Sequence, residues 1–411
     1  MRALAELERP AGSDGEAAAA GLLVEMMAER GLSADIELER SVASFTFPTA
    51  IAAAAGALAG VAGRRWRWPA GLLGVAAAML MADDVDNGRQ LLRRLLPTRP
   101  TPNVLAWTGA AEASETIVLV AHHDASRTGL LFHPGLVPLI ARLFPAWYDR
   151  QRTSVHTGRL LVFGPAVSAI GAISGSRRLR ALGAVWSAGT AALLADVARS
   201  PVVAGANDNL SSVAVLLALA ERLGEQPPGA VRVLLLSTGS EETLMEGMRG
   251  FVRRHRAELD PAHTRVVALE CVGSPHLMLI EGEGMLRMRD YDVTLRDELQ
   301  ASADERGIGL WRGLRLGAGG TDALPALRAG YRAACLAACD DLKQPANYHW
   351  PSDVPENLCW ATIERAVELL EGFVRRVGSE ASTRREPRYG SSGVVGADAA
   401  SNVSRQPLEQ K

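Results

Sequence analysis

The sequence predicts an α/β protein, a three-layer α/β/α sandwich with a mixed, mostly parallel sheet that is interrupted by two inserted hydrophobic helical hairpins. Short, continuously apolar segments alternate along the chain with longer segments of helical periodicity. The apolar segments lack polar alternation, as expected for strands that are buried on both faces. Four long uncharged stretches, rich in Ala and Gly, predict the two hairpins.

Composition and charge exclude several classes of protein. The chain has 411 residues, 48% hydrophobic and 22% charged, which is enough for one large core or two domains. A formal net charge of −2, with no long run of Lys or Arg, argues against nucleic acid as a partner. The four cysteines include no Cys-x-x-Cys pair, so we expect them to be buried rather than to bind zinc or form disulfides. The sequence leaves the oligomeric state open.

The predicted elements divide the chain into six segments. The α/β domain is expected in three parts, residues 1–40, 83–157 and 199–378, separated by hairpins at 41–82 and 158–198 and followed by a disordered tail at 379–411. The first part holds a helix at 17–27, whose start has the capping-box pattern of Ser13 and Glu16 and whose stop is Gly31. Strands are expected at 104–108, 116–121, 231–237, 265–270 and 333–338, and further helices at 209–223, 245–255, 290–306 and 356–377.

Each hairpin consists of two uncharged stretches joined by an arginine-rich turn. Residues 41–63 and 69–82 flank the sequence RRWRW, and residues 160–176 and 181–195 flank RRLR. A helix needs about 20 apolar residues to span a bilayer; the first stretch reaches this length and the other three fall slightly short. We expect the hairpins to span a membrane and contact lipid, and the alternative is a soluble domain of buried Ala-rich helices. The first residues of the chain lack the pattern of a secretory signal peptide.

Metal-competent side chains follow the predicted strands, where ligand sites form in open α/β sheets. His122 and Asp124 follow the strand at 116–121 and share a face of an extended chain, so Asp124 can orient the imidazole of His122, whereas His123 points the other way. An ordinary pair of polar residues is the alternative. Asp208 lies before a helix, where it either binds cations or caps the helix.

Glu241 and Glu242 are the strongest single signal. Adjacent carboxylates just past a buried strand repel each other unless a cation or a proton compensates their charge, so one is expected to bind metal and the other to transfer a proton. Glu270 ends another apolar strand, and His349 lies in a loop, where a lone histidine is usually a surface residue. Together these segments offer imidazole and carboxylate ligands without sulfur, which suits zinc.

These segments resemble family twenty-eight of the metallopeptidases, which includes aminopeptidases, glutamate carboxypeptidases and, more distantly, glutaminyl cyclases. VLVAHHDAS resembles the His-x-Asp strand end of that family, GANDNLSS its Gly-x-x-Asp segment, and EE its catalytic Glu pair. LECVG resembles its fourth metal segment, and YHWPSDVPENL its closing His motif. The segment GGTDALPALRAGYRAACL is similar to its substrate loop.

The resemblance implies a zinc-exopeptidase-like fold with two Zn²⁺ ions per chain and a peptide substrate. One ion would be held by His122 and Glu270 and the other by Glu242 and His349, with Asp208 bridging both. Catalytic roles are implied for Glu241, as the general base, and for Asp124, as the partner of His122. Substrate contacts are implied for Thr321, Asp322 and Tyr348.

The implied activity is that of an aminopeptidase. The alternatives are a glutaminyl-cyclase-like aminoacyltransferase and a non-catalytic membrane protein that retains the fold. Glu270 stands where the family more often has Asp, which affects the metal spacing, and Ala323 stands where a His is common. The arginine-rich turns favour the cytoplasmic side, so the α/β domain is expected outside a bacterial cell membrane.

Overall fold

The α/β fold predicted from the sequence is confirmed. The computed structural model describes residues 1–385, and its central feature is a seven-stranded sheet in the order β1-β2-β4-β3-β5-β9-β6. The central strands β4, β3, β5 and β9 run parallel, and β2 and β6 flank them in the antiparallel direction. The strands are β1 (Ala34–Ser41), β2 (Arg99–Gly109), β3 (Glu115–His122), β4 (Val231–Thr238), β5 (Thr264–Glu270), β6 (His276–Leu279) and β9 (Arg332–Cys339); β7 (Gly282–Glu283) and β8 (Arg289–Asp290) form a separate two-stranded sheet.

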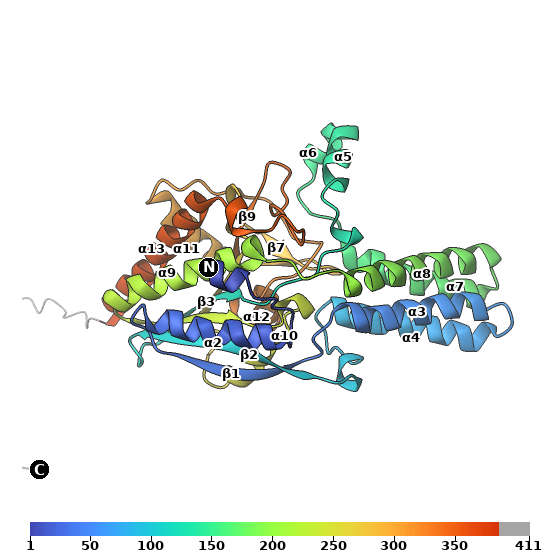
Figure 1. Cartoon of the computed structure of the whole chain (residues 1–411), viewed down its shortest axis with the longest axis horizontal. Helices are drawn as coiled ribbons and strands as arrows, with labels where there is room; N and C mark the ends of the chain where they lie inside the picture. Colours follow the sequence, from blue (N-terminus) through green and yellow to red (C-terminus); the bar gives the residue numbers. More distant parts are fainter. Residues whose placement is uncertain (386–411) are drawn as a thin grey trace, which may run out of the picture.

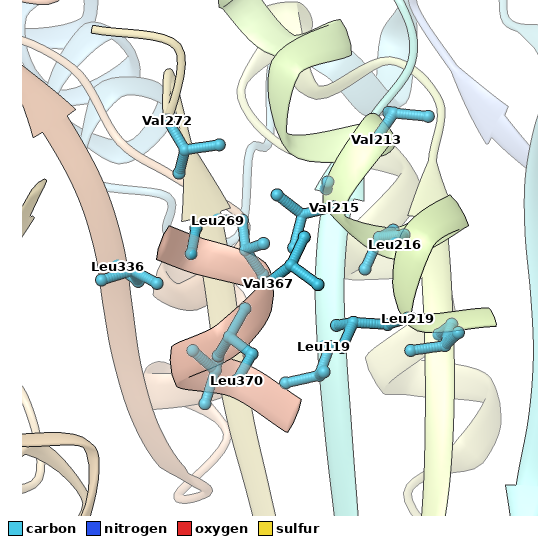
Figure 2. Close-up of a cluster of buried hydrophobic side chains, with 14 of the residues drawn as sticks. Leu119, Val213, Val215, Leu216, Leu219, Leu269, Val272, Leu336, Val367 and Leu370 are labelled. Carbon is cyan, nitrogen blue, oxygen red and sulfur yellow. The ribbon is translucent and has the colours of Figure 1, made fainter. Parts of the chain in front are cut away.

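Helices cover both faces of the sheet. One face packs against α2 (Asp14–Ala28), α9 (Ser211–Glu225), α11 (Val293–Asp304) and α13 (Trp360–Arg385), and the other against α10 (Glu246–His255) and α12 (Ala323–Arg328). Figure 2 shows the first interface, where Leu119 of β3 lies beneath Leu219 of α9 and near Leu370 of α13. Burying a side chain of this size stabilises the fold by about 1.5–3 kcal/mol. Because successive residues of β3 enter opposite cores, the strand is apolar throughout.

The register of the parallel strands brings their carboxyl ends to one edge of the sheet. His122 at the end of β3 pairs with Thr238 at the end of β4, and Glu270 at the end of β5 pairs with Ala337 of β9. The residues that follow these strands therefore lie close together, as the sequence predicts. The sequence did not predict β1 and β6, the two edge strands, because each is short or rich in charged residues.

Four long apolar helices form a bundle that projects from one end of the α/β domain (Figure 1). They are α3 (Thr46–Ala62), α4 (Arg67–Val85), α7 (Thr157–Ser174) and α8 (Arg177–Arg199). Glycines allow close contact between them: a Cβ added to Gly74 of α4 would meet Ala169 of α7 at 2.9 Å. The arginine-rich turns lie together at the far end, where Arg67 donates to the carbonyl oxygen of Ile173.

The lengths of these helices differ from those expected. Three of them are long and apolar enough to cross a membrane, namely α4, α7 and α8, whereas α3 is shorter, with 17 residues. The expectation that only the first stretch reaches a spanning length is therefore wrong. Residues 41–45 belong to the end of β1 and a loop, while α4 and α8 gain length by including charged residues such as Asp84 and Arg177.

The capping box at α2 forms only in part. Ser13 Oγ accepts a hydrogen bond from the backbone NH of Glu16, as predicted. The Glu16 carboxylate does not return to Ser13 but accepts hydrogen bonds from the backbone NH groups of Gly12 and Ser240. At the other end of the chain, α13 continues past Gly378 to Arg385, and residues 386–411 of the predicted tail lie outside the described residues.

A buried ion pair joins the bundle to the α/β domain. Asp84 of α4 is 3% exposed, and its carboxylate accepts hydrogen bonds of 2.6 and 3.2 Å from Arg93, which is 4% exposed. Arg93 also donates to the carbonyl oxygen of Thr243 at 2.9 Å, next to Glu242. The pair therefore connects the base of α4 to the turn that carries the glutamate pair.

Replacing Asp84 by Ala is expected to lower the free energy of unfolding by about 3 kcal/mol, because it leaves the buried Arg93 guanidinium with one carboxylate, that of Glu246 at 3.2 Å, in place of two. Chemical denaturation of the purified full chain measures the effect. Asp83→Ala is the matched control, because Asp83 accepts only exposed backbone hydrogen bonds from Arg89 and Leu91. Equal losses in the two variants would contradict a special role for the buried pair.

Candidate metal centre

His122 ends β3 with its imidazole fully inside the site. Its Nδ1 lies 3.3 Å from the backbone oxygen and 3.4 Å from a carboxylate oxygen of Asp124, which leaves Nε2 directed away from the strand. Nε2 lies 3.2 Å from Asp208 and 3.7 Å from Glu270. The neighbouring His123 points the other way, as predicted: its Nδ1 is 3.0 Å from Ser237 Oγ, and burial lowers its pKa to about 4.

Asp208 lies in a turn that is held from two sides. The backbone NH groups of Asn207 and Asp208 donate to the carboxylate of Asp353 at 2.6 and 3.2 Å. The amide of Asn209 bonds the chain around Glu270, with Nδ2 donating to Leu269 at 2.9 Å and Oδ1 accepting from the NH of Cys271 at 3.0 Å. The turn therefore positions the Asp208 and Glu270 carboxylates relative to each other.

The glutamate pair follows β4 in a tight turn. Ser240 and Leu244 on either side adopt left-handed backbone angles, with φ of 50° and 68°. The backbone NH groups of Glu241 and Glu242 donate to the two carboxylate oxygens of Asp124 at 3.0 and 3.1 Å. Asp124 thus connects the end of β3 to this turn, so its carboxylate orients His122 and both glutamates.

His349 approaches from the loop between β9 and α13. Its Nε2 lies 2.9 Å from Asp208 Oδ2 and 3.1 Å from Glu242 Oε1. The ring is held by a stacked contact with Tyr348, with centroids 3.9 Å apart, and by an edge contact with Phe132 at 4.4 Å. His349 is 4% exposed, so the alternative of a surface histidine does not describe it.

The five predicted ligands form two triplets that share one residue. The first triplet is His122, Asp208 and Glu270, and the second is Asp208, Glu242 and His349; within each, one potential ligand atom per residue lies within 4.8 Å of the others. The two Asp208 oxygens are divided between the triplets, because Oδ1 faces His122 and Oδ2 faces His349. The arrangement offers two adjacent sites bridged by one carboxylate.

The donor atoms fit divalent cations better than they fit one another. Glu242 Oε1 and both ring nitrogens of His349 are buried and make no hydrogen bond among the described residues, although Nε2 lies close to two carboxylates. Nitrogen and oxygen atoms that lie this close without hydrogen-bond geometry are expected where their lone pairs all point to the position of a metal ion. Buried polar atoms otherwise cost free energy when they have no partner. Imidazole nitrogen and carboxylate oxygen together suit Zn²⁺ or a related ion.

The electrostatics of the site point the same way. Burial raises the pKa of Glu241 well above its ordinary value, assisted by the nearby carboxylates of Glu270 and Asp322. Burial also raises the pKa of Glu270 to about 7, against the opposing effect of His122. Burial alone would raise the pKa of Asp208, but the adjacent imidazoles of His122 and His349 outweigh it and lower that pKa. Clustered carboxylates of this kind need bound protons or cations to remain together.

The three predicted substrate contacts occupy different environments. Thr321 is buried and bonded to Glu283, which accepts from the Thr321 backbone NH at 2.7 Å. Asp322 accepts a hydrogen bond from Thr238 Oγ1, its Oδ1 is buried with no partner among the described residues, and burial raises its pKa to about 6. Tyr348 is 37% exposed. The substrate role of all three stays a prediction.

The structure adds supporting residues that the sequence did not single out. Arg9 is fully buried and donates to the carbonyl oxygens of His123 at 2.8 Å and Ala204 at 2.9 Å, so it connects the segments that precede and follow the α7–α8 hairpin. Asp353 fixes the Asp208 turn, as described above. Asp353 lies four residues after His349, in the same loop segment. A carboxylate so close to a candidate metal ligand could have been predicted from the sequence to support the site.

The fold and the two triplets define an α/β protein with a candidate two-cation centre at the carboxyl edge of its sheet. Residues 187–374 match the model of Peptidase family M28. No curated protein matches the chain in sequence.

Solved structures with this fold include enzymes of two kinds. The zinc aminopeptidase BSAP from Bacillus subtilis is 14% identical, with 90% of each chain covered and a TM-score of 0.50. LapB from Legionella pneumophila is 12% identical with a TM-score of 0.52, covering 92% of this chain and 69% of LapB. Glutaminyl cyclase from Bacteroides thetaiotaomicron, bound to N-acetylhistamine, is 12% identical with a TM-score of 0.50, covering 90% of this chain and 92% of the cyclase.

Proposed function

We propose that the chain is a zinc-dependent exopeptidase that removes N-terminal residues from peptides and holds two Zn²⁺ ions. The observation that carries this proposal is the pair of ligand triplets sharing Asp208. The match of residues 187–374 to Peptidase family M28 supports it. Glu270 occupies a position where the metallopeptidase family that the chain resembles more often has the shorter Asp. Its carboxylate still comes within 3.7 Å of His122 Nε2.

The residues divide the work between binding and proton transfer. His122, Asp208 and Glu270 hold one ion, and Asp208, Glu242 and His349 hold the other. Bound Zn²⁺ supplies Lewis acidity toward the scissile carbonyl and lowers the pKa of water. Glu241 belongs to neither triplet, so its carboxylate takes the proton from the attacking water and passes it to the leaving amine. The Asp124 carboxylate accepts a hydrogen bond from the backbone NH of Glu241, which positions Glu241, and it also orients the imidazole of His122.

A glutaminyl-cyclase-like transferase is the second candidate, favoured by the fold shared with the Bacteroides enzyme. A cyclase site with one zinc needs a single triplet of ligands, whereas this chain brings two complete triplets together. The second triplet is therefore the feature that favours hydrolysis. A non-catalytic protein retaining the fold would have no need to keep both.

The deciding experiment combines metal analysis with two substrates. The purified full chain is expected to hold two zinc ions, to hydrolyse aminoacyl anilides and to lose this activity on chelation. Cyclisation of peptides that begin with Gln, together with one zinc per chain, would overturn the peptidase assignment in favour of the cyclase. Protein that binds no metal and converts neither substrate would overturn both.

We also propose that the four-helix bundle spans a membrane and leaves the α/β domain outside the cytoplasm. The helices α4, α7 and α8 are long and apolar enough to cross a bilayer, and the arginines of the far turns match the charge bias of cytoplasmic loops. In whole cells, a membrane-impermeant thiol reagent is expected to label a cysteine at Leu38 of the α/β domain but not one at Arg65 of the far turn. The reverse pattern would contradict this orientation.

A further inference from the structure

A short arm, residues 130–150, stands off from the molecule between the α/β domain and the bundle. It contains η2 (Leu130–Phe132), α5 (Leu136–Leu143) and α6 (Pro145–Arg150), and Figure 1 shows it extending crosswise to the bundle, at the end of the bundle nearest the α/β domain. No residue of α5 or α6 is buried. A helix of eight residues is too short to be stable alone in water, so the arm needs a surface to lie on.

The exposed side of the arm is apolar and aromatic. Leu136, Leu139 and Leu143 are spaced three and four residues apart on α5, and each is exposed by more than half, at 58%, 51% and 59%. Phe144 and Trp147 follow with 59% and 50% exposure. This spacing places the leucines on one face of the helix. Large apolar patches of this kind mark binding surfaces.

Both ends of the arm are anchored, one to the bundle and one to the loop that follows β9. The backbone NH of Leu130 donates to Asp196 at 2.7 Å, near the end of α8 that adjoins the α/β domain. At the other end, Tyr148 donates to the carbonyl oxygen of Leu342, and Lys343 donates to the carbonyl oxygen of Asp149 at 2.9 Å. Between these anchors Phe132 touches His349. The arm therefore has a defined position next to both.

The position and chemistry of the arm together indicate what its exposed apolar face contacts. If α4, α7 and α8 cross a bilayer, the membrane surface lies at the base of the bundle, where Asp196 holds the arm. The arm carries two exposed arginines, Arg142 and Arg150, against one acidic residue, Asp149, and the exposed Arg152 follows directly after it. Basic residues beside an apolar stripe suit anionic headgroups. Trp and Tyr side chains concentrate at this depth of a membrane.

We infer that residues 130–150 form an interfacial arm that lies in the headgroup region of an anionic bilayer and keeps the metal centre close to the membrane surface. The inference rests on the proposed membrane location of the bundle. It also deepens the proposed peptidase function, because the favoured substrates become polypeptides whose free N-terminus lies near the membrane surface.

Depth measurements on spin labels test the arm separately from the bundle. The full chain, carrying Cys359→Ser to remove the one cysteine that is not buried, is reconstituted into phosphatidylcholine vesicles that contain phosphatidylglycerol. Single labels are placed at Leu139→Cys on the arm, Leu72→Cys on α4 and Leu38→Cys on β1. These leucines are exposed by 51%, 69% and 59%, so the sites are matched before any membrane is present.

Collision with oxygen and with a water-soluble nickel chelate reports the surroundings of each label. We expect the label at 139 at headgroup depth, the label at 72 deeper in the hydrocarbon, and the label at 38 in water. If the label at 139 is as accessible to water as the label at 38, while the label at 72 lies in lipid, the proposed role of the arm is wrong but the proposed membrane location of the bundle stands. A label at 72 in water overturns both. A label at 139 shielded from both reagents points to a second copy of the chain and overturns the lipid assignment.

Activity provides the second test. The variant Leu136→Ser/Leu139→Ser/Leu143→Ser is expected to hydrolyse a soluble aminoacyl anilide at the wild-type rate, and to cleave a lipid-anchored peptide in the same vesicles about tenfold more slowly. Leu38→Ser is the control and should match wild type on both. Equal rates for the triple variant and the control on the anchored peptide would overturn the arm's role. Failure of wild-type protein to cleave either substrate would contradict the peptidase function, while the depth measurements would still decide the arm.

Discussion

Replacing Glu241 by Gln is expected to lower kcat by about 10³-fold while zinc content stays at the wild-type level. Glu241 lies outside both ligand triplets, whereas the adjacent Glu242 belongs to the second one. Its pKa is raised by burial and by neighbouring carboxylates, which makes it a stronger proton acceptor than an ordinary glutamate. Steady-state hydrolysis of an aminoacyl anilide, with elemental analysis of the same sample, measures both quantities.

The adjacent residue provides a matched comparison. Glu242→Gln makes the same chemical change one position along the same turn, where the side chain faces His349. This variant is expected to lose zinc as well as activity. Full activity in Glu241→Gln, or loss of zinc equal to that in Glu242→Gln, would contradict the division of roles between the two glutamates.

The strand ends explain why so much of the site was predictable from the sequence. Buried parallel strands are apolar throughout, so a histidine or carboxylate that follows one stands out in the sequence and lies at the common edge of the sheet. This reasoning located His122, Glu241, Glu242 and Glu270, and the register of β3, β4 and β5 brings these strand ends side by side. The mutual approach of Asp208 and His349 was accessible only through the family resemblance, since both lie in loops.

Features that depend on long-range contacts could not be predicted from the sequence. From the sequence, Arg9 is expected to be a surface charge beside a proline. Only the folded chain shows that it donates hydrogen bonds to segments more than 100 residues away. Glu16 fits a local capping box, but its carboxylate instead bonds Ser240, beside the glutamate pair. The lengths of the uncharged runs also gave wrong helix lengths. A helix can continue through a charged residue such as Asp84 when a partner, here Arg93, neutralises its charge.

Asp208→Asn is expected to remove both zinc ions and to lower activity by more than about 100-fold. The two carboxylate oxygens face different imidazoles, His122 and His349, at 3.2 and 2.9 Å. An amide offers one oxygen and one NH₂ group, so residue 208 can give an oxygen ligand to at most one triplet, and its lack of charge weakens the binding of both ions. Elemental analysis and zinc titration of the purified variant measure the loss.

Two comparison variants separate a shared ligand from an ordinary one. Glu270→Gln alters only the first triplet and is expected to retain one zinc ion, whereas Asp208→Asn retains none. Asp353→Asn leaves every ligand in place but weakens the acceptor for the Asn207 and Asp208 backbone NH groups, so zinc affinity should fall by about 10–100-fold with stoichiometry unchanged at saturation. If Asp208→Asn held one zinc ion as firmly as Glu270→Gln does, Asp208 would serve a single ion, and the two triplets would be independent sites.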